Sequence, residues 1–126
     1  MPPFFKKTLL LLFGLISISC SGIDIDVFKQ FGEESFNRQK WLDGDEMVKG
    51  KMVYDFLKKN TPIKQQNGAS IVAQLGEHTG YYLYDHFPAY YIGPKPPNSN
   101  AKAYLLAFVL DQETNQVKEI YLHPKL

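Results

Sequence analysis

The sequence predicts an α+β domain in which two N-terminal helices pack on one face of a three- to four-stranded antiparallel sheet. Two observations lead to this prediction. Apolar residues recur with helical spacing between residues 46 and 75, and after Gly76 they recur with the spacing of extended chain. Helices that precede a run of strands are typical of α+β domains, in which the helices cover one face of the sheet. We expect a single domain of this kind over residues 27–126.

The first predicted helix spans residues 46–59. Its start is marked by Asp43-Gly44-Asp45, which forms a turn and supplies carboxylates near the positive end of a helix. Its end is marked by Lys58, Lys59 and Asn60, with a proline two residues further on. The apolar positions return every three to five residues and so form one face of an amphipathic helix: Val48, Met52, Val53, Phe56 and Leu57.

The second predicted helix is shorter and lies between Asn67 and Gly76. Asn67 is a suitable N-cap because its side-chain oxygen can accept a hydrogen bond from the first turn of a helix. Gly76 suits the left-handed conformation in which many helices end. Ile71, Val72 and Leu75 give the helix an apolar edge.

Four runs after Gly76 are rich in residues that favour strands: residues 81–84, 89–92, 104–110 and 117–122. The third run carries apolar side chains on both faces, which predicts a central strand. The fourth run alternates between apolar and polar residues, as expected where one face of a sheet meets water.

An aromatic arm precedes the first helix. Between residues 27 and 41, Phe28, Phe31, Phe36 and Trp41 are separated by polar residues, which predicts one or two helical turns. The two predicted helices can cover only one face of the sheet. We therefore expect the second face to be covered either by this arm or by a partner.

The first twenty residues have the layout of a bacterial export signal. Two lysines, Lys6 and Lys7, precede an apolar run over residues 9–18, and Ser19 and Cys20 follow. A charged start, a short apolar stretch and small residues at the cleavage point mark a secretory signal peptide. The run is too short to cross a bilayer, which takes about 20 apolar residues. The sequence predicts a signal peptide over residues 1–19.

The cleavage point has two interpretations. Ser17-Ile18-Ser19 before Cys20 resembles a lipobox, after which the cysteine carries lipid and residues 20–26 form a short tether to the membrane. Alternatively, the small residues suit ordinary signal peptidase, which would release a soluble secreted protein. Cys20 is the only cysteine of the chain, and lipidation would explain an unpaired cysteine in an exported protein. Ser21 stands where inner-membrane lipoproteins of enteric bacteria carry Asp, so this resemblance implies the outer membrane.

Composition and motifs give no sign of nucleic-acid binding, of catalysis or of a bound cofactor. Without residues 1–19 the chain has 12 basic and 13 acidic residues, so nothing draws it to nucleic acid. No phosphate-binding loop or nucleophile motif is present. Glu77-His78 and Asp85-His86 offer groups that bind zinc, but their spacing fits no metal motif, and we interpret them as surface or loop residues. We expect no catalytic residue, metal or cofactor.

Tyrosines supply the remaining functional signal. Seven of the eight lie in the predicted strand region, where they are either ordinary strand residues or parts of a binding surface, with stacking on glycans as a further alternative. The candidate binding surface consists of Tyr81, Tyr82, Tyr84, Tyr90, Tyr91, Tyr104 and Tyr121.

Three short motifs and their order resemble a known family. They are Lys51-Met52-Val53-Tyr54-Asp55-Phe56-Leu57, then Ile71-Val72-Ala73-Gln74-Leu75-Gly76-Glu77, then Tyr91-Ile92-Gly93 before a final hairpin. Over residues 45–123 the chain is similar to small BLIP-like lipoproteins of the SmpA/OmlA group, which includes a subunit of the outer-membrane β-barrel assembly machine. Unlike that group, it has no acidic residues after its second cap and no proline after Gly76-Glu77. The resemblance implies a BLIP-like fold and an outer-membrane location.

These observations favour a non-catalytic lipoprotein of the bacterial cell envelope. It would be held at the membrane by lipid on Cys20 and would bind an envelope protein as an accessory or scaffold. Two alternatives remain open at this point. One is a module that binds or hydrolyses cell-wall material, and the other is a soluble secreted protein that binds its target as an inhibitor does.

Overall fold

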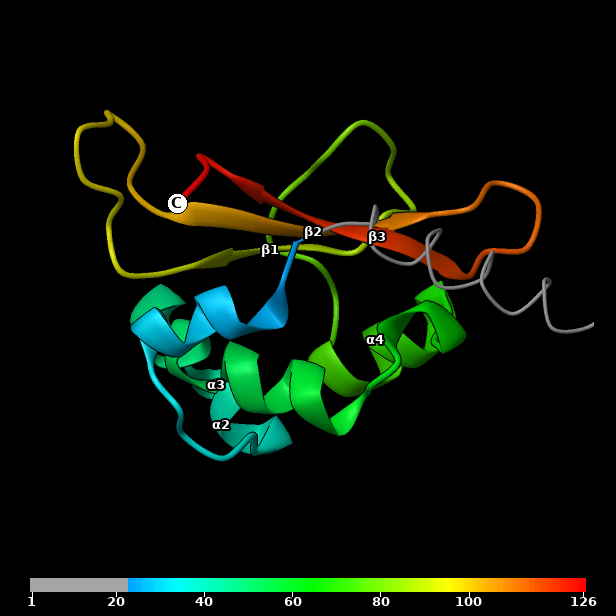
Figure 1. Cartoon of the computed structure of the whole chain (residues 1–126), viewed down its shortest axis with the longest axis horizontal. Coiled ribbons are helices and arrows are strands. Elements are labelled where there is room, and N and C mark those ends of the chain that lie inside the picture. Colours follow the sequence, from blue (N-terminus) through cyan, green and yellow to red (C-terminus); the bar gives the residue numbers. More distant parts are fainter. Residues whose placement is uncertain (1–22) are drawn as a thin grey trace, which may run out of the picture.

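A computed structural model describes residues 23–126 of the chain, and the predicted signal peptide and Cys20 lie outside this range. The described chain forms two layers, a group of helices and a sheet above it (Figure 1). In chain order the elements are the 3₁₀-helix η1 (Ile25–Phe31), α2 (Arg38–Asp43), α3 (Glu46–Lys59), the 3₁₀-helix η2 (Ile63–Gln65), α4 (Gly68–Leu75), β1 (Ala89–Ile92), β2 (Tyr104–Leu110) and β3 (Val117–His123). The predicted α+β class, with the helices before the strands, is confirmed.

The sheet is antiparallel and has the strand order β1-β2-β3. β2 is therefore central, as its apolar character on both faces predicts. In the register, Ala107 of β2 lies between Ala89 of β1 and Tyr121 of β3. An irregularity between Val109 and Leu110 leaves Lys118 as an extra residue on β3, since these two residues pair with Glu119 and Val117. This bulge explains why Lys118 and Glu119 are both exposed.

The predicted strand over residues 81–84 does not form. Tyr82 and Tyr84 make only an isolated bridge, and Leu83 between them has a φ of 59°, in the left-handed region. The edge of β1 that such a strand would join is already occupied, because Thr79 and Gly80 both donate to the carbonyl oxygen of Ala89. A tyrosine-rich run forms a strand only where a neighbour can pair with it, and here none is available.

Both predicted helices form, with the caps expected from the sequence. The Asp45 side chain accepts a hydrogen bond from the N–H of Val48 at 3.0 Å, and Asn67 accepts one from Ser70 at 2.9 Å. Gly76 ends α4 with a φ of 80°. Both caps satisfy backbone N–H groups that a helix N-terminus otherwise leaves unpaired.

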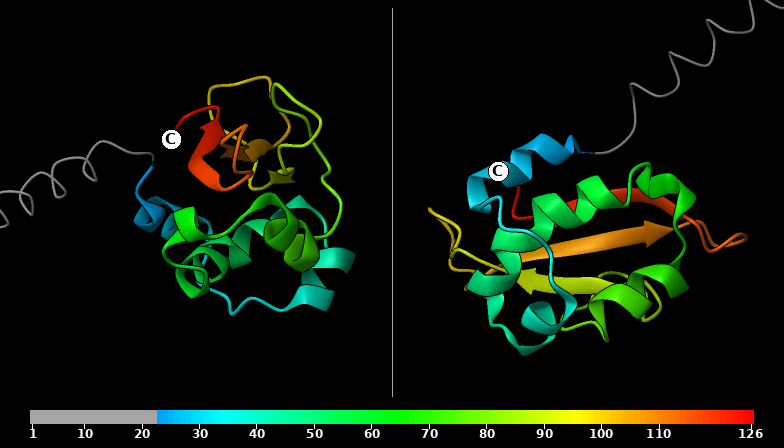
Figure 2. Two further views of the ribbon diagram at one scale, coloured as in Figure 1. Left: turned by 90° about the vertical axis from the view of Figure 1, so that its right-hand side faces the viewer. Right: turned by 90° about the horizontal axis from the view of Figure 1, so that it is seen from below.

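The aromatic arm joins the helical layer and does not cross to the other face of the sheet. Phe28 and Trp41 are buried, and the ring of Phe31 lies 5.1 Å from that of Tyr104, which points into the core. Figure 2 shows η1 in blue next to β3, with α2 among the other helices. The arm holds two helical elements, and η1 begins inside the stretch of residues 20–26 that the sequence predicts as a tether.

One carboxylate ties the arm to α3. Asp55 accepts a hydrogen bond from the N–H of Phe36 at 2.7 Å, and the ammonium of Lys59 lies 2.8 Å from the same oxygen. Both contacts favour the charged carboxylate, so the Lys59 ammonium and then the Phe36 N–H hold the pKa of Asp55 below its usual value.

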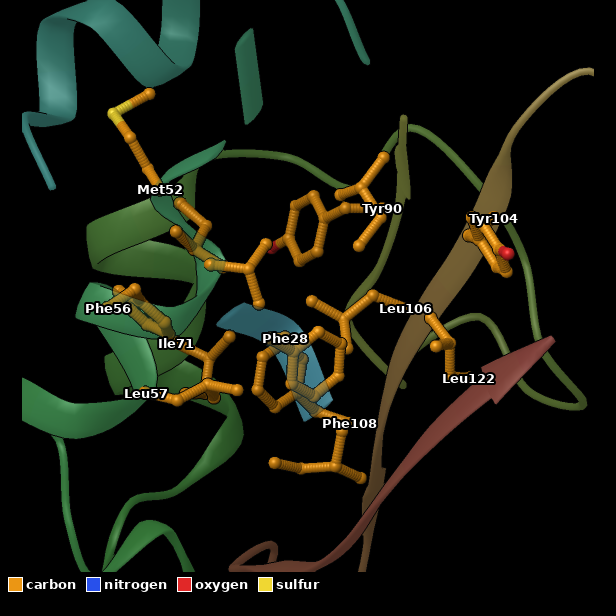
Figure 3. Packing of buried hydrophobic residues seen from close by; sticks show 14 of the residues in the cluster. Phe28, Met52, Phe56, Leu57, Ile71, Tyr90, Tyr104, Leu106, Phe108 and Leu122 are labelled. Atoms are coloured by element: carbon orange, nitrogen blue, oxygen red, sulfur yellow. The ribbon is translucent and has the colours of Figure 1, made fainter. Parts of the chain in front are cut away.

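The core lies between the sheet and the helices (Figure 3). Phe56 of α3 and Phe108 of β2 meet edge to face with ring centroids 6.3 Å apart, and Phe28 and Leu106 are fully buried. No helix within residues 23–126 is long and apolar enough to cross a membrane.

Gly50 marks the closest approach of α3 to the end of β1. A Cβ atom placed on Gly50 would lie 2.1 Å from the carbonyl oxygen of Gly93, and the N–H of Gly93 donates to the carbonyl of Glu46 at 2.7 Å. In an exposed helix, Gly to Ala stabilises by about 1 kcal/mol. At Gly50 the added methyl group would collide with backbone atoms of Gly93, so the substitution should destabilise the protein.

We predict that Gly50→Ala lowers the free energy of unfolding by about 1–3 kcal/mol, because α3 must move away from the sheet. Urea unfolding followed by the fluorescence of Trp41 measures this change. Lys58→Ala, at an exposed position of the same helix, is the control and should change stability by less than about 0.5 kcal/mol. A Gly50→Ala protein more stable than the parent would contradict the close approach.

Candidate binding surface

The sheet face opposite the helices is built from the alternate residues of each strand. Register places Tyr91, Leu105 and His123 in one row across the three strands, and Ala89, Ala107 and Tyr121 in the next. Side chains in such rows are direct neighbours. Leu105 and Tyr121 are partly exposed and Tyr91 is exposed. This outer face is therefore apolar and aromatic over much of its area.

Residues 77–88, here called the cover loop, cross part of this face. The ring of Tyr82 stacks on that of Tyr121 with centroids 4.4 Å apart and planes inclined by 25°. Gly80 packs so closely that a Cβ atom there would lie 2.5 Å from a methyl carbon of Leu105. In Figure 1 the loop rises above the sheet, on the side away from the helices. The cover loop, and not the aromatic arm, covers part of the second face.

Two of the seven candidate tyrosines belong to the core. Tyr90 is fully buried, and its hydroxyl donates to the carbonyl oxygen of Gly76 at 2.8 Å. Burial raises the pKa of Tyr90 because the phenolate would lose its hydration. Tyr104 is 4% exposed and contacts Phe31. Both point toward the helices, so they are not part of a binding surface.

The other five tyrosines lie on the outer face or in the cover loop. Tyr81, Tyr84 and Tyr91 are 58%, 49% and 42% exposed, whereas Tyr82 and Tyr121 form the half-buried stacked pair. Leu83, which the sequence interpretation did not single out, is 58% exposed at the loop tip. Its position between Tyr82 and Tyr84, two residues of the candidate surface, is the sequence feature that could have identified it. We call this group the aromatic surface: Tyr81, Tyr82, Leu83, Tyr84, Tyr91 and Tyr121.

The two His-carboxylate pairs come together in space. Glu77, His78, Asp85 and His86 line one shallow hollow beside α4. Within residues 23–126, however, no group of three or more His, Cys, Asp or Glu side chains is placed to hold a metal ion. Both histidines are exposed, as the sequence interpretation expects, and the ring of His86 lies 4.9 Å from that of Phe87.

Adjacent tyrosines on β1 allow the division between core and surface to be tested. We predict that Tyr90→Phe lowers the free energy of unfolding by about 1 kcal/mol, because the Gly76 carbonyl loses its hydroxyl donor. Tyr91→Phe, the matched control, removes a hydroxyl from an exposed ring and should change stability by less than about 0.5 kcal/mol. Urea unfolding measures both, and equal effects would show that the two tyrosines are not distinguished in this way.

Comparisons of the chain with family models, with curated proteins and with solved structures give no match. The resemblance to the SmpA/OmlA group therefore stays a prediction.

Proposed function

We propose that this chain is a non-catalytic lipoprotein of the bacterial cell envelope that binds another protein through its aromatic surface. It would act as an accessory or scaffold module at the outer membrane, on the periplasmic side. The observation that carries the proposal is the exposure of three tyrosines and a leucine in the cover loop and on β1.

The exposure of these residues supports a protein partner. Tyrosine is enriched in protein interfaces because a rigid ring buries a large area and keeps a polar hydroxyl for hydrogen bonding. The side chain of Leu83 at the loop tip offers no hydrogen bond, so it suits an apolar pocket of a protein better than a glycan, whose hydroxyl groups need polar partners. Removing this apolar surface from water is most favourable when a complementary apolar surface of a partner covers it.

Lipid on Cys20 would hold the folded domain close to the membrane. Ile23, the first described residue, follows Cys20 by three positions, so their Cα atoms can be at most about 11 Å apart. Each buried methylene of an acyl chain contributes about 0.8 kcal/mol, so two or three chains would hold the domain close to the bilayer. The proposed membership in the SmpA/OmlA type agrees with this arrangement.

We predict that a photo-crosslinking residue at Tyr84 captures one specific envelope protein in native membranes, because this ring is exposed in the aromatic surface. The same residue at Gln39, exposed on α2 in the helical layer, is the control and should capture none. Tyr84→Ala should then weaken binding to the captured protein about tenfold or more.

Two results would contradict this assignment. The first is equal capture from Tyr84 and Gln39. The second is capture of cell-wall fragments, with no protein, from a probe placed at His86. That result would favour the second candidate function, a module acting on cell-wall material, for which the hollow lined by Glu77, His78, Asp85 and His86 is the supporting observation.

The lipid anchor gives a separate prediction. The mature protein should begin at Cys20 and exceed the mass of its polypeptide by a diacylglyceryl group and a further acyl chain, and globomycin should cause the precursor to accumulate. Cys20→Ser should abolish both the added mass and the sensitivity to globomycin. A mature protein that carries no lipid on Cys20 would refute acylation and favour the soluble secreted protein.

A further inference from the structure

The two edges of the sheet differ in how they are closed. At β1, the cover loop donates two N–H groups to Ala89, and the side-chain oxygen of Thr79 accepts the N–H of Tyr91 at 2.9 Å. At β3, the described residues cover the start of the edge, where the N–H of Val117 donates to the carbonyl of Gln66 at 2.9 Å. Beyond this point no other part of residues 23–126 makes a backbone hydrogen bond to the outer edge of β3. Residues 23–126 therefore leave the edge of β3 free beyond Val117.

Register identifies which groups face that edge. The N–H of Phe108 donates to the carbonyl of Pro88 on the β1 side at 2.8 Å, so the odd-numbered residues of β2 direct their N–H and C=O groups toward β3. Their partners on β3 are Glu119, Tyr121 and His123. Ile120 and Leu122, which alternate with these partners, direct their backbone groups outward. Four groups, two N–H and two C=O, are thus available to an added strand.

An apolar hollow runs beside this edge. Its lining includes Ile23 and Val27 from the N-terminal segment, Ile120 and Leu122 from β3, and Leu126, which is 48% exposed. Figure 2 shows η1 in the helical layer, on the side of the molecule where β3 lies. A strand added to β3 would find its backbone partners on the edge and an apolar floor for the side chains that point toward the helices.

We propose that the strand added here is β3 of a second copy of this chain, paired antiparallel about a two-fold axis at Tyr121. Ile120 of one protomer would then face Leu122 of the other, so all four outward backbone groups are paired. On the outer face, Glu119 of one protomer lies opposite His123 of the other, twice over, and the two Tyr121 rings lie opposite each other. The two sheets join into one, with an isologous interface.

Neighbouring registers are less favourable. Centring the axis on Ile120 places Lys118 opposite Leu122 and leaves Glu119 opposite Tyr121, which loses the Glu119–His123 pairs. Centring it on Leu122 places Ile120 opposite Pro124, which has no N–H to donate. Exposed charges on an edge strand usually oppose pairing, but in the Tyr121 register each Glu119 meets an imidazole. The self-complementary Glu119–His123 pairs therefore select a second copy in one register.

The first arm of the test uses charge substitution on the mature protein, purified from membranes in mild detergent. Sedimentation equilibrium should show a reversible dimer. His123→Glu places two carboxylates opposite each other twice and should raise the dimer dissociation constant about tenfold. The double variant Glu119→Lys with His123→Glu places opposite charges across the interface and should bring the constant back toward that of the parent. Both positions are exposed, so far-UV circular dichroism should not change.

The second arm uses disulfide crosslinking. Tyr121→Cys should form a disulfide-linked dimer under mild oxidation, because the two residues face each other across the axis at about 4.5 Å between Cα atoms. Lys118→Cys, off the axis, should not, and the parent protein controls for Cys20. A protein that stays monomeric, equal crosslinking from both positions, a double variant no tighter than His123→Glu alone, or crosslinking of Tyr121→Cys to a different protein would overturn the proposal. Because both arms read self-association, they are independent of capture through Tyr84.

Discussion

The two apolar faces of β2 set the requirement that the rest of the fold meets. Leu106 and Phe108 are fully buried on the helical side, while Leu105 and Val109 point to the other side. A sheet with such a strand at its centre needs cover on both faces, and apolar area left in water would cost roughly 25 cal/mol for each Å². The helices and the aromatic arm meet this requirement on one face. The cover loop meets part of it on the other, through the stacking of Tyr82 on Tyr121. In this short chain, a small number of segments must therefore cover both faces of the sheet.

Local signals predicted the elements well because they act within one turn of chain. Asp45 and Asn67 cap the helices they were expected to cap, and the alternation after Val117 correctly identified the buried Ile120 and Leu122. The predicted strand over residues 81–84 was wrong because its outcome depended on an edge elsewhere in the fold. Thr79 and Gly80 occupy the edge of β1, which no property of the tyrosine run itself could indicate. The face of the sheet on which the arm packs likewise depends on tertiary contacts, such as that of Phe31 with Tyr104.

The sequence predicted that tyrosines form the candidate site, but it did not predict which tyrosines belong to it. Period-two alternation separates Tyr90 from Tyr91, since neighbours in a strand point to opposite faces. It does not say which of them faces the helices, because both faces of this sheet are apolar. In the structure Tyr90 faces the helices, where its ring packs against Trp41 and Phe108 and its hydroxyl donates to the carbonyl of Gly76. The exposure of Leu83 was not predicted, because a leucine in a predicted strand implies burial. In the structure, the left-handed conformation of this residue leaves its side chain in water.

The cover loop links the proposed binding surface to the free edge. Its first residues close the edge of β1, and its later residues reach across the outer face to Tyr121 on β3. One segment therefore covers part of the outer face and closes the edge of β1, while the described residues 23–126 leave the edge of β3 open beyond Val117. If β3 pairs with a second copy, the stacked Tyr82 and Tyr121 rings of the two protomers come side by side across the two-fold axis. The aromatic surface of each copy would then lie on the same face of the joined sheet, so a partner could contact both copies at once, and the avidity of such a contact would depend on dimerisation.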